Sequence, residues 1–263
     1  MLVEAVFLRW GHDFRDYSQA SLKRRVLHAQ KQMGVASVSA LQERMLHDAT
    51  AFSELLEHLT VPVSEMFRDP HYFRALRTQV VPVLRTYPSL KIWVAGCGAG
   101  EEPYSMAILL EEEGLLDRTM LYATDINPAA LDKARAGIFS AEQVRLFTSN
   151  YQQAGGTRSF SDYYTADYGA VVLDQRLRRN ITFADHSLAT DSVFAETQFV
   201  SCRNVLIYFN RTLQDRALGL FHDSLAHRGF LGLGTKETME FSAWKPRFEQ
   251  VARAERIYRK VAQ

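Results

Sequence analysis

Three closely spaced glycines, Gly96, Gly98 and Gly100, follow a short apolar run and precede two glutamates, Glu101 and Glu102. Glycine has no Cβ, so the backbone here can turn sharply and lie flat against a ligand. The third glycine comes one position earlier than in the G-x-G-x-x-G loop of dinucleotide sites. The two carboxylates would repel a pyrophosphate at the helix N-terminus. A ligand with an adenosine, a cationic centre and no phosphate fits better, and S-adenosylmethionine (SAM) is such a molecule.

A further acidic residue, Asp125, ends the next apolar run, residues 120–124. An acid at the end of the second strand, 25 residues past Gly100, is placed to accept hydrogen bonds from ribose hydroxyls. The following Asn127-Pro128 pair predicts a helix N-cap and first helical position. The alternative interpretation of Asp125 is an aspartate that caps the helix. The alternative interpretation of the three glycines is a tight turn before a helix whose first turn is acidic. The glycine loop upstream favours the ribose interpretation.

Positioning these residues requires a parallel sheet with helices, and the sequence after residue 86 has that pattern. The glycine loop is a strand–loop–helix unit whose helix spans residues 103–113 and ends at Gly114. Further strands are predicted at 120–124, 181–183, within 198–210, and at 230–233. A helix from Leu213 is expected to end at Gly229. Residues 248–260 predict a final hairpin that turns at Ala254-Glu255.

The first sixty residues predict helices. Leu22, Val26, Ala29 and Met33 recur at helical spacing before Gly34, a predicted C-terminal cap. A second helix is predicted to begin at Ser39, with Gln42 completing a capping box, and to continue to about residue 59. Residues 61–70, bracketed by prolines, predict an irregular connection into a helix that starts near Asp69 and ends near residue 85.

Basic residues gather on the first of these helices. Lys23, Arg24, Arg25 and Lys31 occur in a stretch without any acidic residue, although the whole chain has a net charge of only +1. The ordinary interpretation is a solvated helix face, and the functional one is a docking surface for an acidic partner.

Residues 147–180 differ from the flanking segments because tyrosines and paired glycines surround a short apolar run. We predict an inserted loop or small β-rich subdomain here. Loops of this length are usually functional or mobile. The predicted domains are residues 1–62, a helical substrate-docking domain; 63–85, a connecting loop and helix; and 86–263, the sheet domain with its insertion.

Composition narrows the class of protein. The chain has 263 residues, 47% of them hydrophobic, which is typical of a globular protein of one or two domains. Its two cysteines, Cys97 and Cys202, indicate a reducing compartment and no structural metal. The sequence shows no leader and no apolar run of the ~20 residues that span a bilayer, so we expect a cytoplasmic protein. The small net charge and the lack of a basic stripe with stacking aromatics argue against nucleic acid.

Three separated motifs resemble one known family. They are SEMFRD at residues 64–69, GEEPYS at 100–105 with ATD at 123–125, and CRNVLIYF at 202–209. All are similar to motifs of the CheR family, the SAM-dependent protein-glutamate O-methyltransferases of bacterial chemotaxis. The resemblance covers essentially the whole chain. It implies an α/β fold: a Rossmann-like class I SAM-dependent methyltransferase domain with a small N-terminal helical domain and an inserted small β-rich subdomain.

The resemblance also implies roles for single residues. Ser64 and Arg68 would touch SAM, Glu101 would bind its methionine amino end, and Asp125 its ribose. The remaining implied contacts are the loop glycines Gly96 and Gly98, the adenine edge at Ser187 and Leu188, and the methyl-transfer pocket at Asn204, Val205 and Tyr208. The chain departs from the family pattern at Ser64, Met66 and residues 187–189.

The implied reaction is attack of a glutamate γ-carboxylate on the SAM methyl group, which gives a methyl ester and S-adenosylhomocysteine (SAH). Glutamate ionises near pH ~4.3, so no general base is needed. Arg68 would orient the substrate carboxylate, and Tyr208 would direct the same oxygens or pack against the methyl group.

The implied partner is the cytoplasmic helical bundle of chemoreceptors, docked on Lys23, Arg24 and Arg25, and we expect a monomer that does not insert into membranes. Two alternatives stay open at this point. One is a SAM-binding sensor or scaffold module, and the other is a methyltransferase for a different acceptor.

Overall fold

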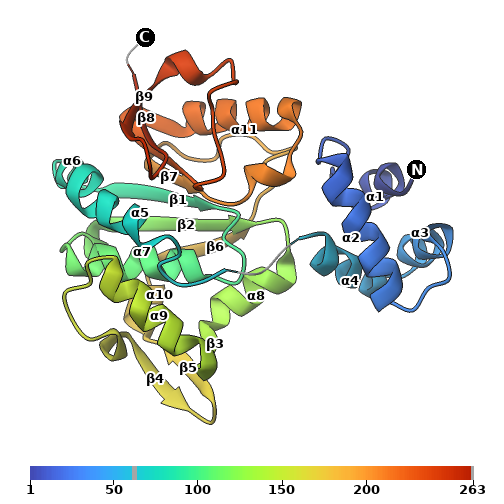
Figure 1. The fold of residues 1–263 in the computed structure, drawn as a ribbon, viewed down its shortest axis with the longest axis horizontal. Helices are drawn as coiled ribbons and strands as arrows, with labels where there is room; N and C mark the ends of the chain where they lie inside the picture. The colour runs from blue at the N-terminus through green and yellow to red at the C-terminus, as the bar shows by residue number, and fades with distance from the viewer. Residues whose placement is uncertain (61–63, 262–263) are drawn as a thin grey trace.

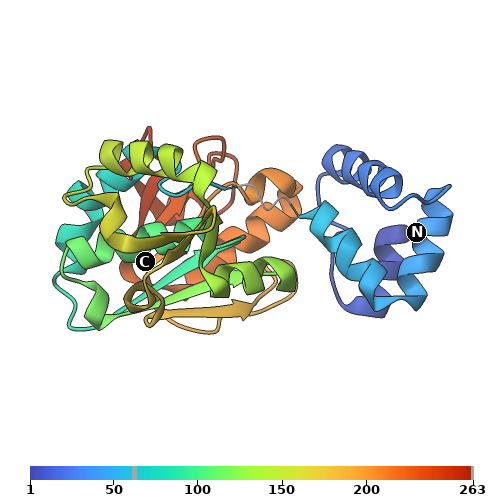
Figure 2. The same cartoon turned by 90° about the horizontal axis from the view of Figure 1, so that it is seen from below.

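The computed structural model describes residues 1–60 and 64–261, and it divides them into a helical bundle and a sheet domain (Figures 1 and 2). The bundle contains α1 (Leu2–Trp10), α2 (Gln19–Gln32), α3 (Val38–His47) and α4 (Ala49–Leu59). These helices bury their own apolar cluster, which includes Val6, Leu41 and Leu55. The predicted boundary between residues 62 and 63 lies outside the described residues. No described helix has both the length and the apolar composition that crossing a bilayer requires.

The second predicted helix differs in its start and its continuity. It begins after Ser37, not Ser39, because the Ser37 hydroxyl accepts a hydrogen bond from the Ala40 N–H at 3.1 Å. It also ends at Asp48, whose extended backbone breaks the helix and whose side chain caps Thr50 N–H at the start of α4. The one long helix of the prediction is therefore two helices, α3 and α4.

The sheet has seven strands in the order β6-β2-β1-β7-β8-β10-β9. They are β1 (Leu90–Ala95), β2 (Thr119–Asp125), β6 (Ile181–Asp185), β7 (Thr197–Cys202), β8 (Leu225–Leu233), β9 (Phe248–Ala252) and β10 (Ile257–Lys260). The first five strands in that order pair in parallel, and β10 pairs antiparallel with β8 and β9. The chain runs from β1 outward to β6 and then returns to β7 on the other side of β1, so the strand order changes direction between β1 and β7.

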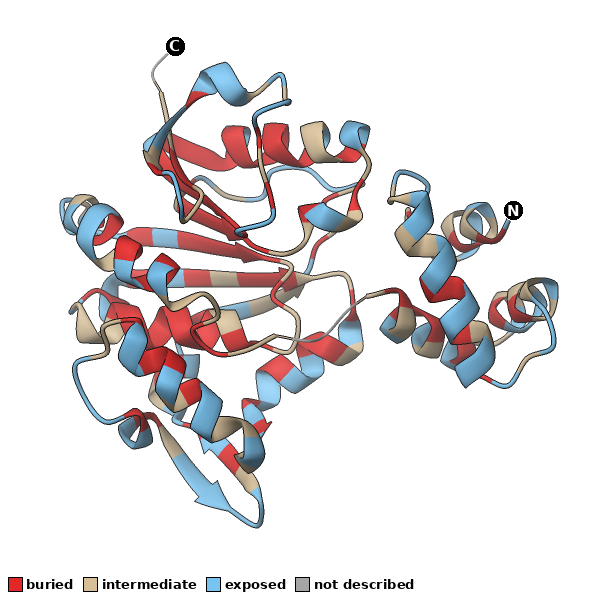
Figure 3. Cartoon of the chain, in the orientation of Figure 1, coloured by how far each residue is buried: buried red, intermediate tan, exposed pale blue. Residues whose placement is uncertain are grey.

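Alternate residues of the strands enter two different cores, as a period of two requires. Ile92 and Val94 pack with α7 (Glu101–Glu112), whereas Trp93 and Ala95 pack with α11 (Arg211–Ser224). Figure 3 shows that most of the sheet is buried by these layers. The short α8 (Pro128–Ala136) begins as predicted, because the Asn127 side chain accepts from Ala129 N–H at 3.0 Å.

Two boundaries in this domain differ from prediction. Helix α7 begins at Glu101, two residues before the predicted start. Helix α11 ends at Ser224 and not at Gly229, because Leu225 already pairs with Thr197 in the sheet. Strand β8 then has a register irregularity near Arg228, whose φ is 59°. The predicted C-terminal hairpin is present as β9 and β10.

The segment between the two domains is part of the sheet domain's core. It contains α5 (Pro70–Ala75), a π-helical turn (Leu76–Val80) and α6 (Val81–Leu84). Phe73, Leu76 and Val80 are buried in the same cluster as β1 and α7. Residues 70–84 are therefore more than a connection, since they cover one face of the sheet (Figure 1).

A small second sheet, ordered β3-β5-β4, stands on the rim of the main one. Its strands are β3 (Ile138–Ser140), β4 (Tyr164–Asp167) and β5 (Ala170–Leu173), and α9 (Ala141–Gln153) lies between β3 and β4. The β-rich insertion thus begins about ten residues before the predicted residue 147, which falls in the middle of α9. The helix was missed because its buried face consists of Phe147, Asn150 and Tyr151 rather than aliphatic residues.

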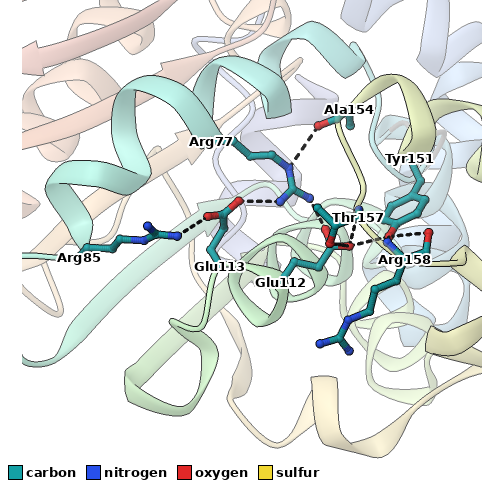
Figure 4. A network of polar contacts seen from close by, with 8 residues as sticks. All are labelled: Arg77, Arg85, Glu112, Glu113, Tyr151, Ala154, Thr157 and Arg158. Carbon is teal, nitrogen blue, oxygen red and sulfur yellow. Dashed lines mark hydrogen bonds and ion pairs between the residues drawn. The ribbon is translucent and has the colours of Figure 1, made fainter.

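A buried carboxylate anchors this subdomain (Figure 4). Glu112 of α7 accepts hydrogen bonds from Tyr151 Oη at 2.6 Å and from Thr157 N–H at 2.8 Å, and it pairs with Arg77. Arg77 also donates to Glu113 at 2.8 Å. Burial acts to raise the pKa of Glu112, but the hydrogen bonds from Tyr151, Thr157 and Arg77 outweigh it and lower the pKa. The ionised carboxylate therefore ties α9 and the turn after it to the main domain.

Candidate functional site

An open cavity lies at the carboxyl ends of β1, β2, β6 and β7. This is where the strand order changes direction, the usual ligand position of open α/β sheets. The predicted residues that line it are Ser64, Arg68, Gly96, Gly98, Asp125, Leu188, Asn204, Val205 and Tyr208. Segments far apart in the chain therefore converge on one site. Glu101 and Ser187 do not line it.

The glycine loop shows two separate reasons for glycine. A Cβ at Gly96 would lie 2.3 Å from Cγ2 of Val205, so only glycine lets the loop approach the turn after β7. A Cβ at Gly98 would meet nothing within 4 Å, because this residue faces the open cavity. All three glycines of the loop have positive φ, which glycine adopts without steric cost.

Asp125 supports the loop and keeps spare acceptors for a ligand. Its Oδ2 accepts the Gly98 N–H at 2.9 Å, and its Oδ1 accepts the Asn127 N–H at 3.0 Å. A carboxylate has about four acceptor positions, so positions remain for ribose hydroxyls. Burial raises the pKa of Asp125, and those backbone hydrogen bonds oppose the rise. Asp125 is thus both a brace for the Gly98 turn and a candidate ligand.

The two glutamates of the motif have different surroundings. Glu102 lines the cavity and is held by Ser201 at 2.6 Å and Arg203 at 3.1 Å. Glu101 is 4% exposed, and its Oε2 has no hydrogen-bond partner among the described residues. Burial raises the pKa of Glu101 to about 7. An unsatisfied buried carboxylate needs a donor, although Glu101 does not itself line the cavity. In the cavity wall, the remaining acceptor positions of Asp125 suit the ribose hydroxyls of SAM, so the residues present fit this cofactor.

Arg68 lies in a strained loop between the two domains. Phe67 and Asp69 on either side have φ values of 54° and 55°, which cost non-glycine residues about 1–3 kcal/mol each. Phe67 is held in place by its buried ring and by its N–H, which donates to Ser105 Oγ at 2.8 Å. No hydrogen bond or ion pair from residues 1–60 or 64–261 engages the Arg68 guanidinium. It lines the cavity with its charge available to a ligand.

Arg203 locks this loop to the glycine-loop helix. Its guanidinium donates to Glu102 at 3.1 Å, to Asp69 at 2.7 Å and to the Arg68 carbonyl at 2.8 Å. It also lies over the Tyr72 ring, 4.2 Å from the centroid, and its side chain is 1% exposed. The position of Arg68 therefore depends on Arg203.

Glu237 holds the loop that contains Asn204, Val205 and Tyr208. Asn204 has a φ of 61°, a conformation that needs outside support. One oxygen of Glu237 accepts the Asn204 N–H at 3.0 Å, and the other accepts the Ile207 N–H at 3.3 Å. Burial raises the pKa of Glu237, and these backbone donors oppose the rise.

The helical bundle contributes to the same cavity through Tyr17, Arg25, Leu59 and Thr60. The Arg25 guanidinium lies 4.1 Å from the centroid of the Tyr208 ring and donates to the Leu59 carbonyl. The expectation that Arg25 joins Lys23 and Arg24 on an exposed surface is wrong, because Arg25 is buried at 9% exposure while the other two are exposed. One turn of α2 thus has an exposed face, with Lys23 and Arg24, and a buried face, with Arg25.

Only one of the two residues predicted to contact the adenine lines the cavity. Leu188 lines the cavity, but the Ser187 hydroxyl accepts Ala189 N–H at 3.3 Å and its own N–H donates to Asp191, so Ser187 shapes a turn. His186 lines the cavity and packs edge-on against Trp93 with ring centroids 5.2 Å apart. Its Nε2 is 3.1 Å from the Ser192 carbonyl.

The site also contains Tyr17, Arg203 and Glu237, which were not among the predicted site residues, and Glu102, for which no separate role was predicted. Arg203 stands inside the CRN motif, so its signal was present. Tyr17 and Glu237 come from segments without a motif, and only the folded chain brings them to the site.

Comparisons with known proteins agree with these features. Residues 62–256 match a model described as the CheR methyltransferase SAM binding domain, and residues 1–60 match the CheR methyltransferase all-alpha domain. Cher3 of Pseudomonas putida, named as a methyltransferase, is 63% identical over 99% of this chain and 95% of its own length. The chemotaxis protein methyltransferase of Listeria monocytogenes is 29% identical over 86% of this chain and 84% of its own. That of Escherichia coli is 27% identical over 93% and 85%.

Proposed function

The chain belongs to the CheR methyltransferase family, and we propose that it transfers the methyl group of SAM to glutamate γ-carboxylates of chemoreceptors. The products would be glutamate methyl esters and SAH. The enzyme class and the cofactor follow from the family, whose matched domain binds SAM. The names of the Listeria and Escherichia relatives support chemotaxis as the setting.

The cofactor would be held by residues of four strand ends. Asp125 would accept the ribose hydroxyls, Leu188 would pack on the adenine, and Gly96 and Gly98 would allow close backbone approach. Glu101 neighbours the lining residue Glu102 and would accept the ammonium group with its Oε2, which has no donor among residues 1–60 and 64–261. Ser64, Asn204 and Val205 complete the wall of the cavity. Bound SAM supplies an electrophilic methyl group on a positively charged sulfur.

The observation that carries the acceptor proposal is the convergence of two arginines and a tyrosine on the cavity. Arg68, Arg25 and Tyr208 come from the interdomain loop, α2 and the turn after β7. Cationic donors of this kind recognise a carboxylate, and Arg68 has no partner among the described residues. Arg68 would orient the γ-carboxylate, and Tyr208 would direct the same oxygens. No base is required because the nucleophile is already ionised near neutral pH.

The remaining work of the site is positioning and exclusion of water. The strained backbone at Phe67, Asp69 and Asn204 is held by buried partners, so the side chains around the reacting atoms are preorganised. A loosened loop would move Arg68 away from the methyl group.

Lys23 and Arg24 would dock the acidic, glutamate-bearing helices of a receptor's cytoplasmic bundle. Both are exposed on α2, one turn or less from Arg25, which reaches the cavity. The exposed face of α2 would then bind the receptor, and its buried face would line the cavity in which the glutamate is methylated.

Incubation with methyl-labelled SAM and the cognate receptor tests this proposal. Base treatment of the receptor should release labelled methanol, the signature of a carboxyl methyl ester. Arg24→Glu should lower receptor methylation yet keep the affinity for SAH. Label that resists base, or that appears only on nucleic acid or a small molecule, would refute the glutamate acceptor.

A further inference from the structure

Tyr17 occupies a position in the cavity that no motif assigns. It belongs to the turn between α1 and α2, yet it lines the cavity together with Asp125 and Ile126 of the sheet domain. Its ring packs edge-on against Phe14 and Phe209, with centroids 4.8 Å and 5.0 Å away. The ring is therefore fixed from both domains.

Backbone hydrogen bonds hold Tyr17 at this position. Tyr17 forms an antiparallel bridge with Phe209. On one side of the bridge the Ser18 N–H donates to the Tyr208 carbonyl at 2.8 Å, and on the other the Asn210 N–H donates to the Asp16 carbonyl at 2.8 Å. We call residues 16–18 the strap. It joins the helical bundle to the turn that carries Tyr208.

Tyr17 has one polar side-chain group, its hydroxyl. Within residues 1–60 and 64–261, no hydrogen bond engages it. Tyr17 is half-buried in the wall of the cavity, and a tyrosine in such a place normally uses its hydroxyl as a hydrogen-bonding group. Burial is the main cause that raises the pKa of Tyr17; the Asp125 carboxylate adds to the rise and the Arg25 guanidinium opposes it. The phenol is thus a neutral donor, within the electrostatic reach of the residue proposed to bind ribose.

From this geometry we propose that the Tyr17 hydroxyl hydrogen-bonds the cofactor at the Asp125 end of the cavity, so that cofactor binding ties the helical bundle to the sheet domain. The proposal rests on the cofactor pocket and not on the glutamate acceptor. A ligand that contacts both walls stabilises the arrangement in which both are present. By reciprocity, whatever holds the bundle in place also raises the affinity for the cofactor.

The first test is the affinity of the full-length protein for SAH, measured by isothermal titration calorimetry. Tyr17→Phe keeps the ring contacts and removes only the hydroxyl, and should weaken binding roughly 2- to 12-fold, the range for one neutral hydrogen bond. Tyr168→Phe is the matched control because Tyr168 is fully exposed on the small sheet. An unchanged affinity in Tyr17→Phe would mean that Tyr17 only packs between the domains, and would overturn the proposal.

The second test measures whether cofactor binding stabilises the hydrogen bonds of the strap. Amide hydrogen exchange at Ser18 and Asn210 reports on the two hydrogen bonds of the strap. SAH should slow exchange at both amides in the wild-type protein and slow it less in Tyr17→Phe. Exchange that SAH leaves unchanged would contradict the coupling. A wild-type protein that shows the protection but does not methylate receptors would refute the acceptor and leave this inference standing.

Discussion

The guanidinium of Arg25 lies over the ring of Tyr208, 4.1 Å from its centroid, although the two residues belong to different domains. Arg25 also donates to the Leu59 carbonyl at the end of α4, so its side chain is fixed between the bundle and the sheet domain. A cation over an aromatic face contributes about 0.5–2 kcal/mol, more when desolvated. The helix that carries the exposed docking residues therefore also completes the cavity wall.

We predict that Arg25→Met lowers kcat/KM for receptor methylation by roughly 10- to 150-fold. This is the loss of a charged hydrogen-bonding group, about 1.5–3 kcal/mol. Arg24→Met removes the same charge one residue away on the exposed face, and serves as the control because it should mainly raise KM. Initial rates with labelled SAM at several receptor concentrations separate the two. Equal effects on kcat in both variants would show that Arg25 acts only through net charge.

We predict that replacing Arg203 lowers the free energy of unfolding. Arg203→Met leaves Glu102 and Asp69 without their cation, and removal of one partner of a buried ion pair costs about 3–5 kcal/mol. The free energy of unfolding from urea titration measures this cost. Arg135→Met is the control, because its pair with Asp132 is solvent-exposed and should contribute less than about 1 kcal/mol. Similar losses in both variants would contradict the role assigned to Arg203.

Much of the fold could be predicted from the sequence because its signals are local. The strand before the glycine loop and the strand that ends at Asp125 are short apolar runs, and the Asn127 cap depends on neighbouring residues. The two serines near the start of α3 show the limit of such rules. Ser37 and Ser39 could each cap a helix, and only the Ser37 hydrogen bond decides between them.

The rest of the site depends on long-range contacts that no local pattern encodes. Arg25 was expected at the surface because it stands among basic residues, but packing of α2 against Tyr208 buries it. Tyr17 reaches the cavity through a bridge to Phe209, 192 positions later in the chain. Glu237 supports Asn204 from a segment with no recognisable motif.

The contact between Gly96 and Val205 gives a steric prediction. Gly96→Ala would place a Cβ 2.3 Å from Val205 Cγ2, and should weaken SAH binding at least about 10-fold, the equivalent of 1.4 kcal/mol. The double variant with Val205→Ala removes the clashing methyl group and should recover part of the affinity. Calorimetric titration with SAH measures both.

Backbone strain at Gly96 needs its own control, since its φ is 73°. Gly11→Ala supplies it, because Gly11 has a φ of 77° and open space around its Cβ position. Both variants should lose about 1–2 kcal/mol of stability from the left-handed backbone. Only Gly96→Ala should lose SAH affinity, and an equal loss in Gly11→Ala would rule out the steric explanation.

The buried Glu101 carboxylate gives a pH dependence whose sign can be worked out. Burial raises its pKa from 4.5 to about 7 in the folded protein. Between these values the folded state binds a proton that the unfolded state lacks, so stability falls as pH rises. The stabilising contribution of Glu101 to the free energy of unfolding is fully present below pH 4.5 and is lost as pH rises through about 7. A shift of this size is worth roughly 3 kcal/mol.

We predict that Glu101→Gln, which cannot ionise, flattens this part of the stability profile. The free energy of unfolding, measured by urea titration between pH 5 and 8, should fall more steeply in the wild-type protein than in the variant. SAH should oppose the fall in the wild type only, since its ammonium group would stabilise the ionised Glu101 carboxylate. Glu142→Gln, on an exposed helix end, controls for the loss of one charge. Parallel profiles for wild type and Glu101→Gln would show that Glu101 does not titrate in this range, and would remove the basis for its proposed contact with the ammonium group.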